Sequence, residues 1–222
     1  MKAAILLAFV LCWVQTAAAG SPTAIASPGQ RNDYLGAVQK YLWPVLASAG
    51  KTGRVYYEAI CPPTEEYPLA FPRMELRPPL TNATDLAAVR SIFREEKGIL
   101  VAEDPVGVIR VRIGKVPDAI LRTRISTLSL NPIEQYNSYS AILAIENAPE
   151  VRSAMEKLHL VVPVRPINMP VVWPADGLPH LPPELSNVTM DQALDMVART
   201  WGSILFYGAC TGPDTYEISE HY

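Results

Sequence analysis

The sequence predicts an α+β fold in which helices pack on a mixed sheet, and a repeated pattern is the first reason. Asn82-Ala83-Thr84 opens a helical stretch that ends at Gly98 and is followed by an apolar strand, a turn and a second strand. Asn187-Val188-Thr189 opens the same succession, with its glycine stop at Gly202. A polar cap and a terminal glycine are typical helix boundaries. We therefore predict a duplicated helix-strand-hairpin unit.

A leading segment adds a second observation. Residues 33–60 combine a helical pattern with a β-rich run, and they precede the first copy of the repeated unit. A less regular stretch precedes the second copy. We predict a first α+β module over residues 33–115 and a second, looser module over residues 116–222, each packed on a mixed sheet.

The first 19 residues have the features of a secretory signal peptide. Lys2 is their single charge, residues 3–14 are apolar, and Ala17-Ala18-Ala19 suits a cleavage site. The apolar run is shorter than the roughly 20 residues that span a bilayer. Residues 20–32 are small and polar and are expected to be a flexible leader. We expect a periplasmic or secreted protein without a transmembrane segment after cleavage.

Composition narrows the class of protein. Of 222 residues, 49% are hydrophobic and 18% are charged, which suits a folded domain and not a disordered chain. The net charge of −3 is mildly acidic. A nucleic-acid-binding domain usually carries a basic stripe, so nucleic acid is not an expected partner.

The first helix is expected over residues 33–50, because apolar side chains recur there at helical spacing. Pro44 interrupts this pattern, so the helix either kinks at Trp43 or consists of two short helices. Residues 54–60 are β-rich and follow as a strand, and residues 73–77 alternate as another strand would.

Each copy of the repeated unit begins with a threonine cap. Thr84 precedes a helix that reaches Gly98, and the strands 99–101 and 108–113 follow, the second alternating apolar and charged residues as a half-buried strand does. Thr189 precedes the last helix, whose apolar stripe is the clearest in the chain: Met190, Ala193, Leu194, Val197 and Trp201. The strands 204–207 and 216–218 complete that copy.

The middle of the chain is less regular. Residues 119–130 carry β-branched side chains and are expected to be extended. A buried helix is expected over residues 139–146, and Pro149 suits the first position of a further helix. Residues 161–164 are expected to form a short strand, and residues 166–183 a loop.

The last unit resembles the secretin and TonB short N-terminal (STN-like) domain, a small periplasmic module. The residues that carry the resemblance are TMDQALDMVARTWG (189–202) and the strand 204–207. The first half is similar over residues 33–114, and residues 119–219 are similar more loosely. The resemblance implies small α/β units that bind partner proteins or gate signals in the periplasm. It implies no catalytic residues.

Two cysteines remain once the signal peptide is removed. Cys61 and Cys210 each end a β-rich run that follows a helix and a glycine. An exported protein folds in an oxidising compartment, so we predict a disulfide between them. Neither cysteine has the close cysteine or histidine neighbours of a metal site, and we expect no metal or cofactor.

The sequence contains no sequence motif of a known catalytic site. HExxH, GxSxG, P-loop and GxGxxG spacings are absent, and an enzyme is not the expected class. The alternative is a secreted hydrolase with its site near Asp176 and His180, where prolines restrict a loop that holds an acid and an imidazole.

One basic cluster is visible in the sequence. Its members are Arg110, Arg112, Lys115, Arg122 and Arg124, with Asp118 as the single acid among them. If the strands 108–113 and 120–125 lie side by side, these arginines form a patch for an acidic partner or an anionic envelope polymer. The alternative interpretation is the solvated face of two strands.

Taken together, these patterns predict an exported, non-enzymatic binding or assembly component of the bacterial envelope. It would act through contacts with another envelope protein. The two alternatives are the hydrolase and a binder of an anionic envelope polymer.

Overall fold

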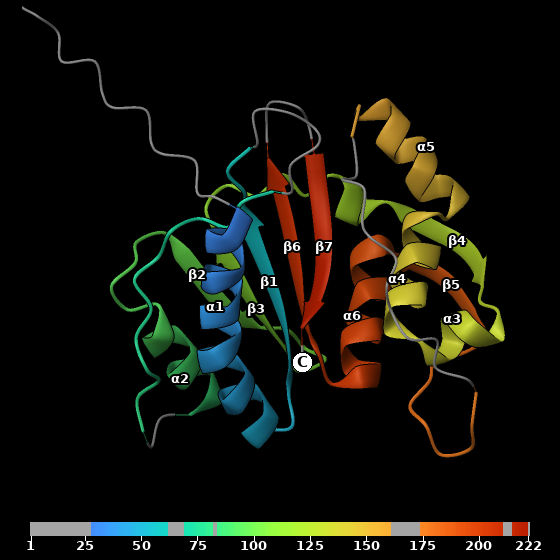
Figure 1. Cartoon of the computed structure of the whole chain (residues 1–222). Helices are drawn as coiled ribbons and strands as arrows, with labels where there is room; N and C mark the ends of the chain where they lie inside the picture. The colour runs from blue at the N-terminus through green and yellow to red at the C-terminus, as the bar shows by residue number, and fades with distance from the viewer. Residues whose placement is uncertain (1–27, 62–68, 82–83, 161–173, 211–214, 222) are drawn as a thin grey trace, which may run out of the picture.

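A mixed sheet of five strands lies at the centre of the protein, which is α+β as predicted (Figure 1). The computed structural model describes residues 28–61, 69–81, 84–160, 174–210 and 215–221. The strand order is β2-β3-β1-β6-β7, and β1 runs parallel to both of its neighbours. The two outer pairs are antiparallel hairpins. The strands are β1 (Thr52–Glu58), β2 (Ile99–Glu103), β3 (Val108–Ile113), β6 (Ile204–Cys210) and β7 (Thr215–His221).

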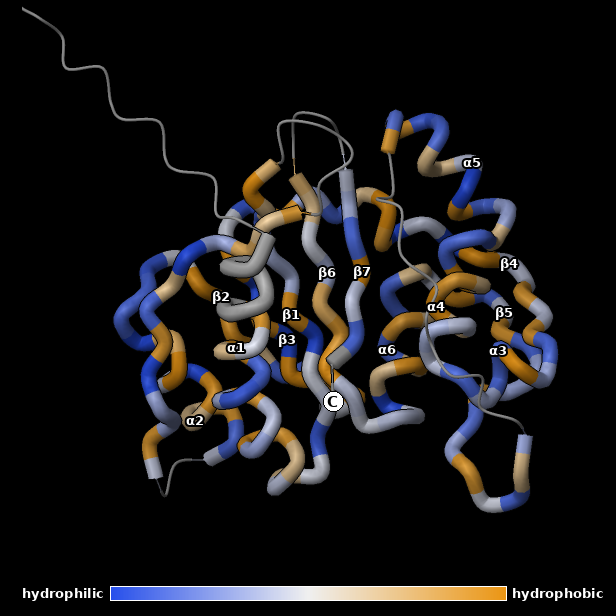
Figure 2. The backbone as a smooth tube through the Cα atoms, in the orientation of Figure 1, coloured by the Kyte–Doolittle hydropathy of each residue, from blue (hydrophilic) through white to orange (hydrophobic). Residues whose placement is uncertain are grey.

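Helices cover both faces of this sheet (Figure 1). α1 (Pro28–Ser48) and α2 (Asp85–Ile92) lie on one face, and α6 (Met190–Trp201) lies on the other. Because strand side chains alternate between faces, Val55 and Tyr57 join the core under α1 and α2, whereas Tyr56 joins the core under α6. Buried residues accordingly run through β1, β3 and β6, and Figure 2 shows hydrophobic segments in β6.

A smaller layer packs outside α6. It contains a two-stranded antiparallel sheet, one 3-10 turn and three short helices. Its helix α4 packs against α6, and the outermost helix, α5, is mainly hydrophilic (Figure 2). The elements are η1 (Ile120–Arg122), β4 (Arg124–Ser129), α3 (Pro132–Tyr136), α4 (Ser138–Glu146), α5 (Pro149–Lys157) and β5 (Glu184–Thr189).

Strands from both predicted modules share the central sheet. β1 pairs with β3 from its own half and with β6 from the other half. The strands that the repeat aligns take different places, because β2 is an edge strand whereas β6 lies beside β1. The duplication itself stays a prediction.

The predicted boundaries of the first helix need correction. α1 begins at Pro28, so the end of the segment 20–32 is helical and not a flexible leader. The helix continues through Pro44 as one element. The signal peptide 1–19 and the rest of the leader lie outside the described residues.

The prediction of a strand over residues 73–77 was wrong. This segment pairs with a helix end, because the backbone N–H of Arg77 donates to the carbonyl of Ile92 at 3.0 Å. The helix after Thr84 is also shorter than predicted, since it ends at Ile92 and leaves a turn before Gly98. Thr84 occupies the N-cap position without a side-chain hydrogen bond to the helix.

Three helices of the second half were predicted correctly. α4, α5 and α6 form where expected, and Thr189 caps α6 with Gln192 as its reciprocal partner. Residues 119–130 divide into η1 and β4. The short helix α3 was not predicted, although Asn131 and Glu134 form a capping box around it. The predicted strand 161–164 lies outside the described residues.

The structure places Cys61 and Cys210 as a disulfide pair, with their Cα atoms 5.5 Å apart. Cys61 follows β1 and Cys210 ends β6, and these two strands are parallel neighbours. Parallel neighbours end at the same edge of a sheet, which brings the two sulfur atoms together. Within the described part of the chain, no helix combines the length and apolar character that crossing a membrane requires.

We expect reduction of this disulfide to lower the free energy of unfolding by up to about 5 kcal/mol, because the bond restricts the unfolded chain between two distant residues. Guanidinium denaturation with and without reductant measures the effect. The Cys61→Ser variant is the matched control, since reductant should not change its stability. An equal response of parent and variant would contradict the disulfide.

A second prediction concerns the contact between β4 and α5. The carboxylate of Glu150 accepts hydrogen bonds from the side-chain hydroxyl of Ser126 and from its backbone N–H, the latter at 2.9 Å. These bonds lower the pKa of Glu150. A lowered acid pKa means that this contact stabilises the fold above the unfolded pKa and is lost as the pH falls through the folded pKa.

Replacing Ser126 with alanine should therefore raise the pKa of Glu150 towards its ordinary value, and an NMR pH titration of the carboxylate measures it. Ser129→Ala, an exposed position on the same strand, is the control and should leave that pKa unchanged. Identical titrations in both variants would mean that the hydroxyl has no such role.

Candidate functional site

A buried ion pair joins the central strand to α6. Arg54, on β1, is 1% exposed and donates to the Asp195 carboxylate at 2.6 Å. The same guanidinium donates to the carboxylate of Asp191 at 2.9 Å and to its backbone carbonyl at 3.1 Å. Asp191 and Asp195 are four residues apart on a helix, so both carboxylates face the sheet from one side of α6.

A second arginine extends this cluster. Arg110 lies opposite Arg54 on β3, and its guanidinium binds Asp191 at 3.0 Å and also binds Asp195. It binds Asp104, in the turn after β2, at 2.9 Å. Tyr56 donates its hydroxyl to Asp191 at 2.9 Å. Three carboxylates and two arginines therefore connect β1, β3, α6 and the turn of the hairpin.

The electrostatics of this cluster reflect its burial. Burial by itself would lower the pKa of Arg54, but Tyr56, Asp191 and Asp195 outweigh it, and that pKa is raised. Burial raises the pKa of Asp195, against the opposing effect of Arg54 and Arg110. Burial also raises the pKa of Tyr56 far above its usual value. Both arginines remain charged. Their ion pairs with Asp191 and Asp195 hold α6 against the sheet.

The hairpin β2–β3 extends beyond α6 and leaves part of the same sheet face open. Leu100 on β2 is 66% exposed and lies directly opposite Arg112 on β3. Cross-strand partners share a face, so Leu100 lies beside Arg112. Arg112 donates to Asp118 at 2.7 Å, and Asp118 also pairs with Arg122 at 3.4 Å. We call this surface the hairpin face; it consists of Leu100, Ala102, Arg112, Asp118 and Arg122.

The four arginines of the predicted patch do not all come together. The strands 108–113 and 120–125 are not neighbours, because β3 lies between β1 and β2 and β4 pairs with β5. Arg110 turns into the buried cluster, and Arg124 donates to Asn187 at 2.7 Å on the smaller sheet. Only Arg112 and Arg122 meet, through Asp118. The sequence identified the arginines as candidate site residues. It did not identify Leu100, because no local pattern indicates that this leucine is exposed.

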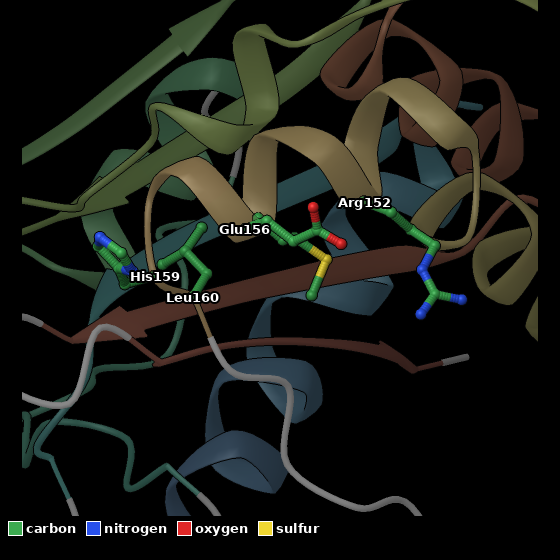
Figure 3. Close-up of a pocket in the computed structure, with 5 residues that line it drawn as sticks. Arg152, Glu156, His159 and Leu160 are labelled. Atoms are coloured by element: carbon green, nitrogen blue, oxygen red, sulfur yellow. The ribbon is translucent and has the colours of Figure 1, made fainter.

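A hollow of about 430 Å³ lies against α5 (Figure 3). Its described lining comes from α5 and the turn after it: Arg152, Met155, Glu156, His159 and Leu160. Figure 3 places Arg152 and His159 at opposite ends of the hollow. His159 has a positive φ of 53°, which ends the helix. These side chains come from one element, so the described residues form no convergent set of polar groups here.

The loop considered for hydrolysis has a different arrangement. Asp176 and His180 are both exposed, and His180 stacks on Tyr136 with ring centroids 4.8 Å apart. Its Nδ1 lies 3.0 Å from the carbonyl of Leu178, which identifies Nδ1 as a donor. In the described ranges, no group of three or more histidine, cysteine, aspartate or glutamate side chains is placed to hold a metal ion.

Comparisons with protein-family models, with curated proteins and with solved structures found no match. The STN-like resemblance and the predicted function therefore stay predictions.

The buried cluster generates a stability prediction. Asp195→Ala should lower the free energy of unfolding by about 3–5 kcal/mol, because it leaves the buried charge of Arg54 without its closest partner. Urea denaturation measures the loss. Asp176→Ala, which removes an exposed carboxylate, is the control and should change stability little. A similarly small effect in both variants would show that the cluster does not hold α6 in place.

Proposed function

We propose that this protein is an exported, non-enzymatic component of the bacterial envelope that binds another protein through the hairpin face. The observation that carries the proposal is the exposure of Leu100, at 66%, on β2, the edge strand of the central sheet. Its cross-strand partner Arg112 and the Arg122 that shares Asp118 with it have the residue type that is enriched in protein interfaces. Covering a leucine side chain completely contributes about 1.5–3 kcal/mol.

The edge of β2 favours a partner that docks on the face of the sheet. Arg90, on α2, donates to the carbonyl of Val101 through Nε at 3.4 Å and Nη2 at 3.1 Å. That carbonyl lies in the middle of β2, and a strand added at this edge would need it as an acceptor. Arg90 thus opposes the addition of a strand, whereas the side chain of Leu100 stays accessible.

Two features support an exported, oxidising compartment for this protein: the predicted signal peptide and the cysteine pair. The predicted signal peptide, residues 1–19, would direct the chain to an oxidising compartment. The pairing of Cys61 with Cys210 suits such a compartment. The resemblance of residues 189–202 to the STN-like module supports a binding role in the periplasm.

One observation favours the second candidate, a binder of an anionic envelope polymer. The side chain of Arg122 is 74% exposed, and Arg124 is also exposed. Retention on an anionic matrix would then depend on these cations and fall as salt screens them. It would not depend on Leu100.

Site-specific photo-crosslinking tests the main proposal. A photoreactive amino acid at Leu100 should give a defined protein adduct in living cells of the source bacterium. The same group at Val106, which is 56% exposed in the turn of the hairpin, is the matched control and should not give that adduct. Absence of the adduct at Leu100, or the same adduct from both positions, would overturn the proposal.

A further inference from the structure

The hairpin face has an excess of positive charge on an acidic protein. Arg112 and Arg122 share Asp118 as their partner. Lys97 and Lys115 are exposed and flank the end of the hairpin where Ile99 pairs with Ile113. Three acids also lie near this end: Glu95 and Glu96 precede Lys97, and the Glu58 carboxylate accepts from the backbone N–H of Lys115 at 2.8 Å. Within the hairpin face, two arginines therefore share one carboxylate, whereas the whole chain carries a net charge of −3.

Asp118 positions both arginines so that they can bind a further anion. Asp118 binds Arg112 at 2.7 Å and Arg122 at 3.4 Å, so one carboxylate sets the position of both guanidinium groups. Arg112 also lies against the ring of Tyr56, 5.5 Å from its centroid. A guanidinium carries five N–H donors, and one carboxylate does not use them all. Arg122, with its side chain 74% exposed, can bind a second carboxylate in the two-pronged geometry that arginine favours.

Leu100 adds a requirement that charge alone does not meet. It is exposed beside Arg112, and a purely anionic chain would leave it uncovered or would place charge on it. On the basis of the function proposed above, we infer that the partner presents an acidic segment with an apolar side chain. The apolar side chain covers Leu100, and flanking aspartate or glutamate side chains bind Arg122 and the lysines at the end of the hairpin.

Three synthetic probes test this inference on the mature chain. The first is a nine-residue peptide of Asp-Glu-Leu repeats, the second has Asn-Gln-Leu repeats, and the third is polyglutamate. Fluorescence anisotropy of the labelled probes gives the affinity. We expect the acidic leucine peptide to bind more tightly than the other two, with an affinity that falls as salt is added.

Variants of the hairpin face make the test specific. Leu100→Glu and Arg122→Glu should each weaken binding of the acidic leucine peptide about tenfold or more, the effect of a central interface side chain. Val106→Glu and Arg152→Glu are matched controls at exposed positions outside the hairpin face, and they should bind as the parent does. Circular dichroism verifies that all four variants are folded.

Each other outcome overturns the inference. Equal binding of the neutral leucine peptide would mean that the charges do not select the partner. Equal binding of polyglutamate, unchanged by Leu100→Glu, would identify an anionic polymer as the ligand. Failure of the acidic leucine peptide to bind would reject the inference directly.

Crosslinking separates this inference from the function on which it rests. If Leu100 gives its specific adduct but the crosslinked partner segment lacks acidic residues, the binding role stands and the inference fails. If Leu100 gives no adduct, the proposed binding role fails, whatever affinity the peptides show.

Discussion

The ion pair between Arg54 and Asp195 joins the central strand to α6, and the rest of the architecture is arranged around it. A guanidinium that is 1% exposed in a sheet is tolerated only with carboxylate partners close by. α6 supplies two such partners to Arg54, Asp191 and Asp195. The neighbouring Arg110 pairs in addition with Asp104 in the hairpin turn. Pairing these charges therefore fixes α6 against β1, and Arg110 on β3 binds the same two carboxylates of the helix.

The position of α6 decides which part of the sheet remains open. The helix covers β1, β6 and the apolar residues around Tyr207, whereas β2 lies at the edge, two strands away from β1. Leu100 is exposed for that reason, although its neighbour Val101 is buried under α2. Arg90 covers a main-chain acceptor at this edge. The protein therefore presents a side-chain surface at β2, and this geometry underlies the proposed binding role.

The central sheet depends on contacts between residues that are far apart in the chain. β1 pairs with β3 about 55 residues later and with β6 about 150 residues later, and Cys61 and Cys210 lie where β1 and β6 end. Such pairings have a large entropy of loop closure, so they form only with the support of the cores on both faces. The two halves of the chain share one sheet, and the stability of each half depends on the other.

The sequence by itself determined the elements whose signals are local. The apolar stripe of α6, its cap at Thr189 and its stop at Gly202 lie within one short segment, and so does the alternation of β3. The sequence analysis missed α3 although its capping box, Asn131 with Glu134, is a local signal. It placed the end of α2 too late; α2 ends at Ile92, whose carbonyl accepts from the backbone N–H of the distant Arg77. Only the tertiary structure decided where the arginines go. Arg110 and Arg112 look alike in the sequence, but Arg110 reaches carboxylates about 80 residues away on α6, and Arg112 lies beside an exposed leucine at the sheet edge. Charge pairing and exposure depend on which elements meet in space, and residue spacing along one strand does not contain that information.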